Sequence, residues 1–126
     1  MTALKSFTDI PQSKKLAEIL PLESADMWWL YITAQGKYIA MMHEEPDPHY
    51  LTRMESYGIK DAAIRCWSLA ALLGVLPKIV NNETLFIETS AALWHVGYRN
   101  IYTARADNPV DACYEMIIKL NELNLL

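Results

Sequence analysis

The sequence is poor in the residues that build common catalytic and phosphate-binding motifs. Its 126 residues include four glycines, which do not cluster, and two cysteines, which lack CxxC spacing. A glycine-rich phosphate loop, a GxSxG nucleophile turn and an HExxH zinc motif are all missing. Cys66 and Cys113 lie in apolar surroundings, so we expect reduced core thiols. These absences favour a non-enzymatic protein and predict no cofactor.

A long apolar run and an excess of one charge are also missing. The longest apolar run, about Cys66 to Leu76, is too short to cross a bilayer of ~30 Å, and the N-terminus lacks the apolar segment of a signal peptide. The net charge is −4, and residues 1–60 and 61–126 each carry −2. Neither half is basic enough to attract nucleic acid or an anionic membrane. We expect a cytoplasmic protein that binds neither of them directly.

Length and composition predict a single domain over residues 1–126. Apolar residues make up 52% of the chain, which is typical of a globular fold with its own core. Three helices are expected, each with a side chain that can cap its first turn. The helices and their expected N-caps are 9–20 with Thr8, 67–76 with Ser68, and 108–122 with Asp107.

Strand-forming residues occur in both halves of the chain. A hairpin is predicted at Met27–Met42, with its turn at Gln35-Gly36, and three more strands at about Thr84–Thr89, Leu93–Tyr98 and Ile101–Ala104. The proline-containing segment His43–Lys60 is predicted to be a loop. The fold class is therefore α+β, with helices on one side of a largely antiparallel sheet. The second half has the order α-β-β-β-α.

A weak internal repeat has an offset of 56 residues. The segment LAEILP at 16–21 corresponds to LLGVLP at 72–77, and a turn and a predicted hairpin follow each of them. This pattern predicts two related α-β-β units that join around one core, with the C-terminal helix 108–122 added. The pseudo-repeat units are 8–42 and 64–104. The alternative is that two short helices end in Leu-Pro by coincidence.

The stretch HEEPDPHY at 43–50 contains the densest group of side chains that can ligate a metal. His43 and His49 are six residues apart, and the prolines between them prevent one continuous helix from presenting both. The carboxylates lack the ligand spacing of a calcium loop. We favour a solvated acidic loop without a bound metal. The alternative is a small metal-dependent hydrolase that uses residues 43–49.

Aromatic side chains provide the best candidate for a binding surface. Trp28 and Trp29 are adjacent in a predicted strand, so their side chains point to opposite faces of the sheet. One of the two therefore faces away from the main core. We predict that Trp28, Trp29, Trp94 and Tyr98 contribute to a sheet face or cleft that binds a partner or ligand. Filling of the core is the alternative role of these rings.

The order α-β-β-β-α is also that of double-stranded-RNA-binding domains. Those domains place basic residues at the start of the last helix, where they meet phosphates. Here Asp107, Asp111 and Glu115 stand at that position and would repel phosphates. Direct binding of nucleic acid is therefore not expected. An accessory protein that acts on a nucleic-acid complex through protein contacts is a further alternative.

Three segments, Gln12–Met27, Cys66–Pro77 and Asn108–Leu126, span nearly the whole chain in order. Together they resemble an uncharacterised small-protein family of gut Bacteroides-type bacteria and of their prophages and mobile elements. The resemblance implies a cytoplasmic protein of phage or mobile-element origin, and it assigns no site residue. From the residues themselves, we predict a non-enzymatic binding or interaction protein whose ligand is a protein partner or a second copy of the chain.

Overall fold

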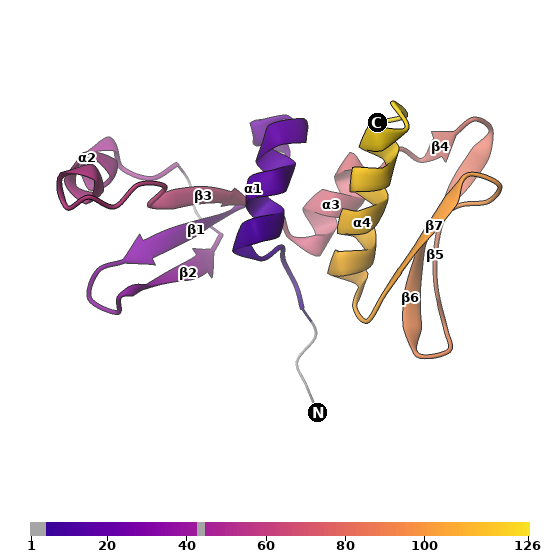
Figure 1. Cartoon of the computed structure of the whole chain (residues 1–126), viewed down its shortest axis with the longest axis horizontal. Coiled ribbons are helices and arrows are strands. Elements are labelled where there is room, and N and C mark those ends of the chain that lie inside the picture. Colours follow the sequence, from indigo (N-terminus) through magenta and orange to yellow (C-terminus); the bar gives the residue numbers. More distant parts are fainter. Residues whose placement is uncertain (1–4, 43–44) are drawn as a thin grey trace. The chain divides into compact units, whose positions relative to one another are not determined.

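The computed structural model describes residues 5–42 and 45–126. The chain divides into two compact units, which are Asp9–Trp67 (the first unit) and residues 5–8 with Ser68–Leu126 (the second unit). Each unit combines helices with an antiparallel sheet, so the predicted α+β class is confirmed (Figure 1). The expectation of a single domain stays a prediction, and each unit is described by itself.

The first unit is built around a three-stranded antiparallel sheet with the order β2-β1-β3. Its elements are α1 (Ile10–Ile19), the short helix η1 (Leu22–Ser24), β1 (Met27–Ile32), β2 (Lys37–Met41), α2 (Pro48–Ser56) and β3 (Ala63–Cys66). The predicted hairpin is confirmed, and Gly36 in its turn has a φ of 64°, which glycine adopts without strain. Helix α1 packs against β3. The buried apolar side chains include Leu16, Leu20, Met27, Leu30, Met54, Ile64, Cys66 and Trp67.

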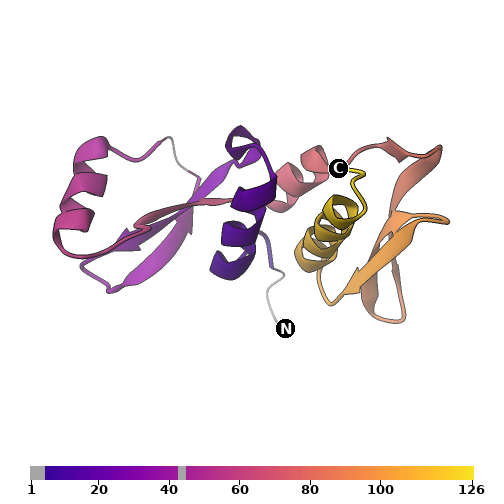
Figure 2. The same ribbon diagram turned by 45° about the horizontal axis from the view of Figure 1, so that its top comes forward.

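The second unit contains a four-stranded antiparallel sheet with the order β4-β5-β6-β7. Its elements are α3 (Leu69–Val75), β4 (Ile79–Val80), β5 (Glu83–Ser90), β6 (Leu93–Tyr98), β7 (Tyr102–Ala106) and α4 (Pro109–Glu122). Both helices lie on one side of this sheet (Figures 1 and 2), and α4 packs against β6, β7 and α3. The buried face of α4 includes the predicted core residues Val110, Cys113, Ile117 and Leu120.

Two of the three predicted N-caps are displaced by one residue. Ser68 caps α3 as predicted, but the cap of α1 is Asp9 and that of α4 is Asn108. Asp9 Oδ1 accepts the Gln12 N–H at 2.8 Å, and Gln12 Oε1 accepts the Asp9 N–H at 3.1 Å. This reciprocal capping box satisfies two donors that a helix leaves open. Thr8 and Asp107 each precede the observed cap by one residue.

The predicted loop at residues 43–60 is wrong, because α2 occupies Pro48–Ser56. Asp47 caps this helix by accepting the N–H of His49 at 3.0 Å. Pro48 stands at the first position, where the missing N–H costs nothing because no helical partner exists for it. The proline that suggested a loop therefore marks the start of a helix. The short strands β3 and β4 were also not predicted.

The two hairpins recur at the offset seen in the sequence. Strands β1 and β5 begin at Met27 and Glu83, and β2 and β6 begin at Lys37 and Leu93, so each pair is 56 residues apart. The next strand differs, since β3 pairs with β1 whereas β7 pairs with β6. The strands form two sheets, one in each unit. The pseudo-repeat itself stays a prediction.

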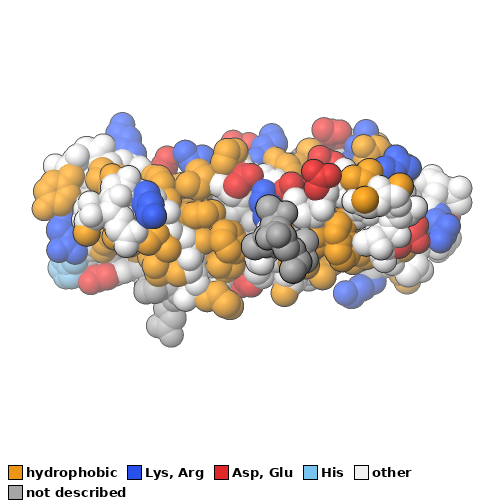
Figure 3. Space-filling view, turned by 90° about the horizontal axis from the view of Figure 1, so that it is seen from below, with side chains coloured by type: hydrophobic (Ala, Val, Ile, Leu, Met, Phe, Trp, Pro, Cys, Tyr) orange, Lys and Arg blue, Asp and Glu red, His pale blue; other side chains and the backbone are white. Residues whose placement is uncertain are grey.

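Acidic and basic side chains are interspersed on the face shown in Figure 3. This mixture is in keeping with the even division of charge between the two halves of the sequence. Among the residues that the structure describes, no helix has the length and apolar character needed to cross a membrane.

Candidate functional site

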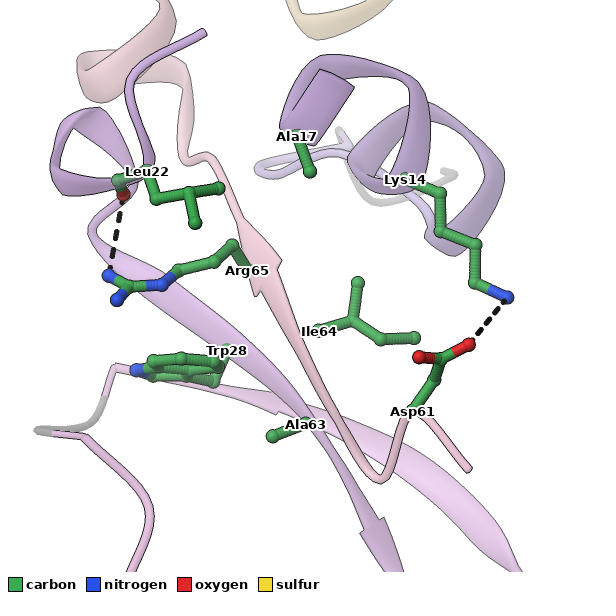
Figure 4. A pocket seen from close by; sticks show the side chains of 8 residues that line it. All are labelled: Lys14, Ala17, Leu22, Trp28, Asp61, Ala63, Ile64 and Arg65. Atoms are coloured by element: carbon green, nitrogen blue, oxygen red, sulfur yellow. Dashed lines mark hydrogen bonds and ion pairs between the residues drawn. The ribbon is translucent and has the colours of Figure 1, made fainter. Parts of the chain in front are cut away.

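The candidate site is a cavity of about 400 Å³ beside strand β3 in the first unit. We call it the Trp28 hollow. Its lining is contributed by α1, η1, β1, β3 and Asp61, which lies just before β3 (Figure 4). The lining residues are Lys14, Ala17, Leu22, Trp28, Asp61, Ala63, Ile64 and Arg65. Apolar walls with a few polar groups at the rim are the usual composition of a ligand site.

Strand pairing places Trp28 in the hollow. In the antiparallel register of β1 and β3, Trp28 lies opposite Arg65 and Trp29 lies opposite Ile64. Side chains alternate along a strand, so Trp28 and Trp29 point to opposite faces of the sheet, as predicted from their adjacency. Both rings are half-buried. Only Trp28 lines the hollow.

Arg65 is held in place by three contacts. Its guanidinium carbon lies 4.4 Å from the centre of the Trp28 ring, a cation–π arrangement. Its Nη1 donates to the Leu22 carbonyl at 3.3 Å, and its Nη2 lies 3.4 Å from Glu45 Oε1 (Figure 4 draws the first of these two). The Glu45 side chain is 82% exposed, whereas that of Arg65 is 24% exposed. An ion pair of this kind contributes little, so a ligand carboxylate can replace Glu45.

A second ion pair lies at the opposite rim. Lys14 Nζ is 3.9 Å from Asp61 Oδ2, and both side chains are more than half exposed (Figure 4). Asp61 and Ala63 also line a smaller hollow of about 190 Å³, to which Trp28 contributes as well. Trp28 therefore lines two cavities that also share Asp61 and Ala63.

The outer edge of β3 carries backbone groups that point away from β1. The Tyr31 N–H donates to the Ala62 carbonyl at 2.8 Å. Because an antiparallel ladder alternates, the N–H and C=O groups of Ile64 and Cys66 face β1, and those of Ala63 and Arg65 face outward. Within residues 5–42 and 45–126, no strand pairs with this outer edge. The hollow thus combines an apolar wall, an arginine and the outward-facing N–H and C=O groups of Ala63 and Arg65.

The predicted aromatic surface is divided between the two units. Trp28 and Trp29 belong to the first unit, and Trp94 and Tyr98 to the second. Tyr98 is fully buried, and its hydroxyl donates to the Pro77 carbonyl at 2.6 Å. Burial, with a smaller contribution from nearby Cys113, raises the pKa of Tyr98 to about 12. The prediction that Tyr98 lies on a binding surface is therefore wrong, since it fills a core.

The remaining members of the predicted surface differ in what surrounds them. Trp94 is half-buried in β6, opposite Thr89 and Ala106.

Ala63 and Arg65 were not recognised as site residues, because β3 is only four residues long. The signal that could have identified them is the alternation of apolar Ile64 and Cys66 with Arg65, which is typical of a strand with one buried face.

The stretch at 43–50 is only partly described. His43 and Glu44 lie outside the described residues. Asp47 caps α2, and His49 is exposed on the first turn of that helix. The described part of the chain contains no group of three or more His, Cys, Asp and Glu residues that could hold a metal. The hydrolase alternative at 43–49 stays a prediction.

Both cysteines are free and buried, in agreement with the expectation of reduced core thiols. Burial raises the pKa of the Cys113 thiol to about 12, so this sulfur stays protonated at neutral pH. A protonated thiol is a poor nucleophile. Cys113 is therefore a core residue of the second unit rather than a candidate for catalysis.

Comparison of the chain with protein-family models, curated proteins and solved structures found no match. The resemblance to a small-protein family of Bacteroides-type bacteria stays a prediction. A functional proposal for this chain must therefore be derived from its own residues, and the Trp28 hollow has the most specific arrangement of them.

Proposed function

We propose that this chain is a non-enzymatic, cytoplasmic binding protein and that the Trp28 hollow is its ligand site. The observation that carries the proposal is the contact of Arg65 with Trp28, 4.4 Å apart, beside an apolar hollow of about 400 Å³. Tryptophan and arginine are among the side chains that most often dominate binding energy at protein interfaces. Here they stand side by side in neighbouring strands of one sheet.

The apolar wall supplies a driving force for binding. Leu22 is 44% exposed at one side of the hollow. A ligand that covers Leu22 and the Trp28 ring removes their apolar surface from water, which contributes about 25 cal/mol per Å². Ala17 and Ala63 are small, so the hollow can admit a side chain or ring between α1 and β3. The hollow therefore suits an apolar group of the ligand.

The position of Arg65 reduces the cost of ordering a charged side chain. The Leu22 carbonyl and the Trp28 ring hold the guanidinium before any ligand arrives. Binding would then immobilise fewer rotatable bonds than it would for a solvent-exposed arginine. An anionic group of the ligand gains a charge-assisted hydrogen bond from Arg65 in exchange for the weak contact with Glu45. The preferred ligand is thus both apolar and acidic.

A fragment screen by NMR tests this proposal without knowledge of the natural ligand. We would record amide and indole spectra of the ¹⁵N-labelled full chain with small aromatic and aliphatic carboxylic acids. The proposal predicts that the shifts of bound fragments concentrate at Trp28, Ala63 and Arg65. Trp28→Leu should abolish binding, and Trp94→Leu, a matched change in the second unit, should preserve it.

Two results would contradict the proposal. One is that fragments bind only at residues remote from Trp28, or bind Trp28→Leu as well as the native chain. The other is turnover of a compound in a metabolite screen, beside an absence of binding at the hollow. The second result would support the enzymatic alternative.

A further inference from the structure

We infer that the ligand of the Trp28 hollow is an extended peptide segment of a protein partner, which adds as a strand to the outer edge of β3 and places an acidic side chain opposite Arg65. The inference rests on the proposed function, because it names the ligand class of that same site. Three observations lead to it. They are the backbone N–H and C=O groups on the outer edge of β3, the extent of the hollow along that strand, and the charge of Arg65.

The first observation concerns backbone hydrogen bonds. Ala63 and Arg65 each direct one N–H and one C=O away from β1, as the alternation from the Tyr31–Ala62 hydrogen bond requires. Backbone groups of this kind need a partner, which is either water or another strand. Addition of a peptide to such an edge supplies main-chain hydrogen bonds regardless of sequence. The edge therefore fits an extended chain better than a compact small molecule.

The second observation is the position of the hollow. It is lined by Ala63, Ile64 and Arg65 in succession. Three consecutive strand residues extend over about 7 Å, since the rise is about 3.4 Å per residue. Figure 4 shows Ala17 of α1 and Leu22 of η1 beside this segment of β3. A peptide strand at the edge would thus lie within the hollow, with apolar side chains of the first unit next to it.

The third observation is charge complementarity. Residues directly opposite each other in neighbouring strands share a face of the sheet. The peptide residue opposite Arg65 therefore lies on the face that carries the Trp28 ring and the guanidinium. Aspartate or glutamate at this position takes the place of Glu45, whose side chain is 82% exposed and whose oxygen is 3.4 Å from Arg65. The adjacent peptide residue faces the side of Ile64, where Ala17 favours a small or β-branched apolar side chain.

A second copy of β3 does not meet this requirement. The strand has the sequence Ala-Ile-Arg-Cys and contains no carboxylate. Pairing of two β3 strands would place no carboxylate from the second strand opposite Arg65, and in the register centred on Arg65 it would bring two guanidinium groups together. Like charges directly opposite each other destabilise a sheet. The complementary charge must therefore come from a different segment.

Selection from a random dodecapeptide library displayed on phage, with the full chain as bait, tests the inference. Enriched peptides should share one acidic position next to β-branched or other apolar residues. Synthetic copies should bind Arg65→Glu at least tenfold more weakly than the native chain. Arg105→Glu is the matched control, because Arg105 is an exposed arginine on edge strand β7 of the second unit, and it should bind normally. If Arg65→Glu does not fold, Arg65→Gln provides the same comparison.

N-methylation of the selected peptide, one residue at a time, tests strand addition. Methyl groups on amides that face β3 should reduce affinity at least tenfold, and those on the intervening amides should have little effect. An alternating profile of this kind reports backbone pairing, whereas side-chain binding alone would give no alternation.

Several outcomes would overturn the inference. They are an absence of enriched peptides, enrichment without a shared acidic position, equal binding to Arg65→Glu, and losses that do not alternate. Self-association of the chain that Arg65→Glu abolishes would also overturn it, in favour of a second copy as the occupant. If fragments bind at Trp28 despite any of these results, the proposed function stands and only the strand-addition inference is rejected. If neither fragments nor peptides bind at the hollow, both the proposed function and the inference are rejected.

Discussion

Arg65 and Trp28 form a cross-strand pair in which the guanidinium carbon lies 4.4 Å from the ring centre. The hydrogen-bond alternation places them in a non-hydrogen-bonded pair, where the Cα atoms are only about 4.5 Å apart and the side chains are closest. Pairing of β1 with β3 thus establishes this contact before any ligand binds. The contact gives the hollow a fixed positive charge above an apolar ring.

A double-mutant cycle should measure the coupling between these two side chains. Arg65→Ala, Trp28→Leu and the double variant should give a coupling free energy of about 0.5–1 kcal/mol, the usual value for a cation–π pair near the surface. Unfolding by urea, followed by far-ultraviolet circular dichroism, gives the change in the free energy of unfolding for each of the three variants relative to the native chain. Additive effects of the single changes would show that the pair is adjacent without being coupled.

Proline substitutions should distinguish the outer edge of β3 from its paired side. Ala63→Pro removes only an outward N–H, so we expect it to change the free energy of unfolding by less than about 1 kcal/mol. Ile64→Pro removes a ladder hydrogen bond and a buried side chain, so it should cost roughly 3 kcal/mol or more.

Thermal and urea unfolding of the two proline variants would make this comparison. In addition, Ala63→Pro should weaken binding of a selected peptide, because one edge donor is missing. The orientation assigned to β3 would be wrong if Ile64→Pro were tolerated and Ala63→Pro were the damaging change.

The sequence was sufficient to predict the α+β class, both hairpins and the core face of α4. These features depend on local patterns that tertiary contacts reinforce. Val110, Cys113, Ile117 and Leu120 recur at helical spacing, and all are buried. The cap of α3 at Ser68 was also predictable, because no neighbouring residue competes for that position.

The candidate site was only partly predictable. Trp28 was recognised from its adjacency to Trp29, whereas Arg65 and Ala63 were missed because a four-residue strand has too little pattern of its own. Strand β3 is defined by its pairing with β1, which lies more than 30 residues earlier in the chain. Tyr98 was misassigned because the sequence does not reveal that the Pro77 carbonyl accepts its hydroxyl in the core.

Gly97 should be essential for the sheet of the second unit. A Cβ at this position would lie 2.3 Å from the Tyr102 carbonyl oxygen and 2.7 Å from Thr103 Cα, both in the backbone. We expect Gly97→Ala to lower the free energy of unfolding by about 1–3 kcal/mol, since the backbone of β7 must shift.

Gly74→Ala is the matched control in the same unit. An added Cβ there meets no described atom within 4 Å, and the residue lies in α3. This change should stabilise the chain by about 0.5–1 kcal/mol. Chemical denaturation measures the free energy of unfolding of both variants. Equal changes in Gly97→Ala and Gly74→Ala would contradict the close approach of β6 and β7.

The buried phenol of Tyr98 should make stability depend on pH above about 10. A tyrosine in an unfolded chain has a pKa near 10, whereas burial raises the pKa of Tyr98 to about 12 in the folded chain. The folded chain favours the neutral phenol. The stability that this preference contributes is therefore complete below pH ~10 and is lost as the pH rises toward 12. Cys113 contributes in the same direction, because burial also raises its pKa to about 12.

Tyr98→Phe isolates the contribution of that phenol. At neutral pH the variant should be less stable by about 1 kcal/mol, because the hydrogen bond to Pro77 is lost. The difference from the native chain should shrink and then reverse in sign between pH 10 and 12, because a rise in the pKa from about 10 to about 12 outweighs one hydrogen bond. Urea unfolding at each pH measures this difference. Tyr57→Phe, a change at an exposed ring, should show no such trend. A constant difference for Tyr98→Phe would contradict the assigned pKa.

Hydrogen exchange at the amides of β3 tests most directly whether this edge takes up a peptide strand. In the free chain, the amides of Ala63 and Arg65 should exchange rapidly, and that of Ile64 slowly, because only Ile64 faces β1. A saturating selected peptide should slow the exchange of Ala63 and Arg65 at least tenfold and leave Ile64 nearly unchanged. Exchange at Ala63 and Arg65 that is unaffected by bound peptide would contradict strand addition at β3.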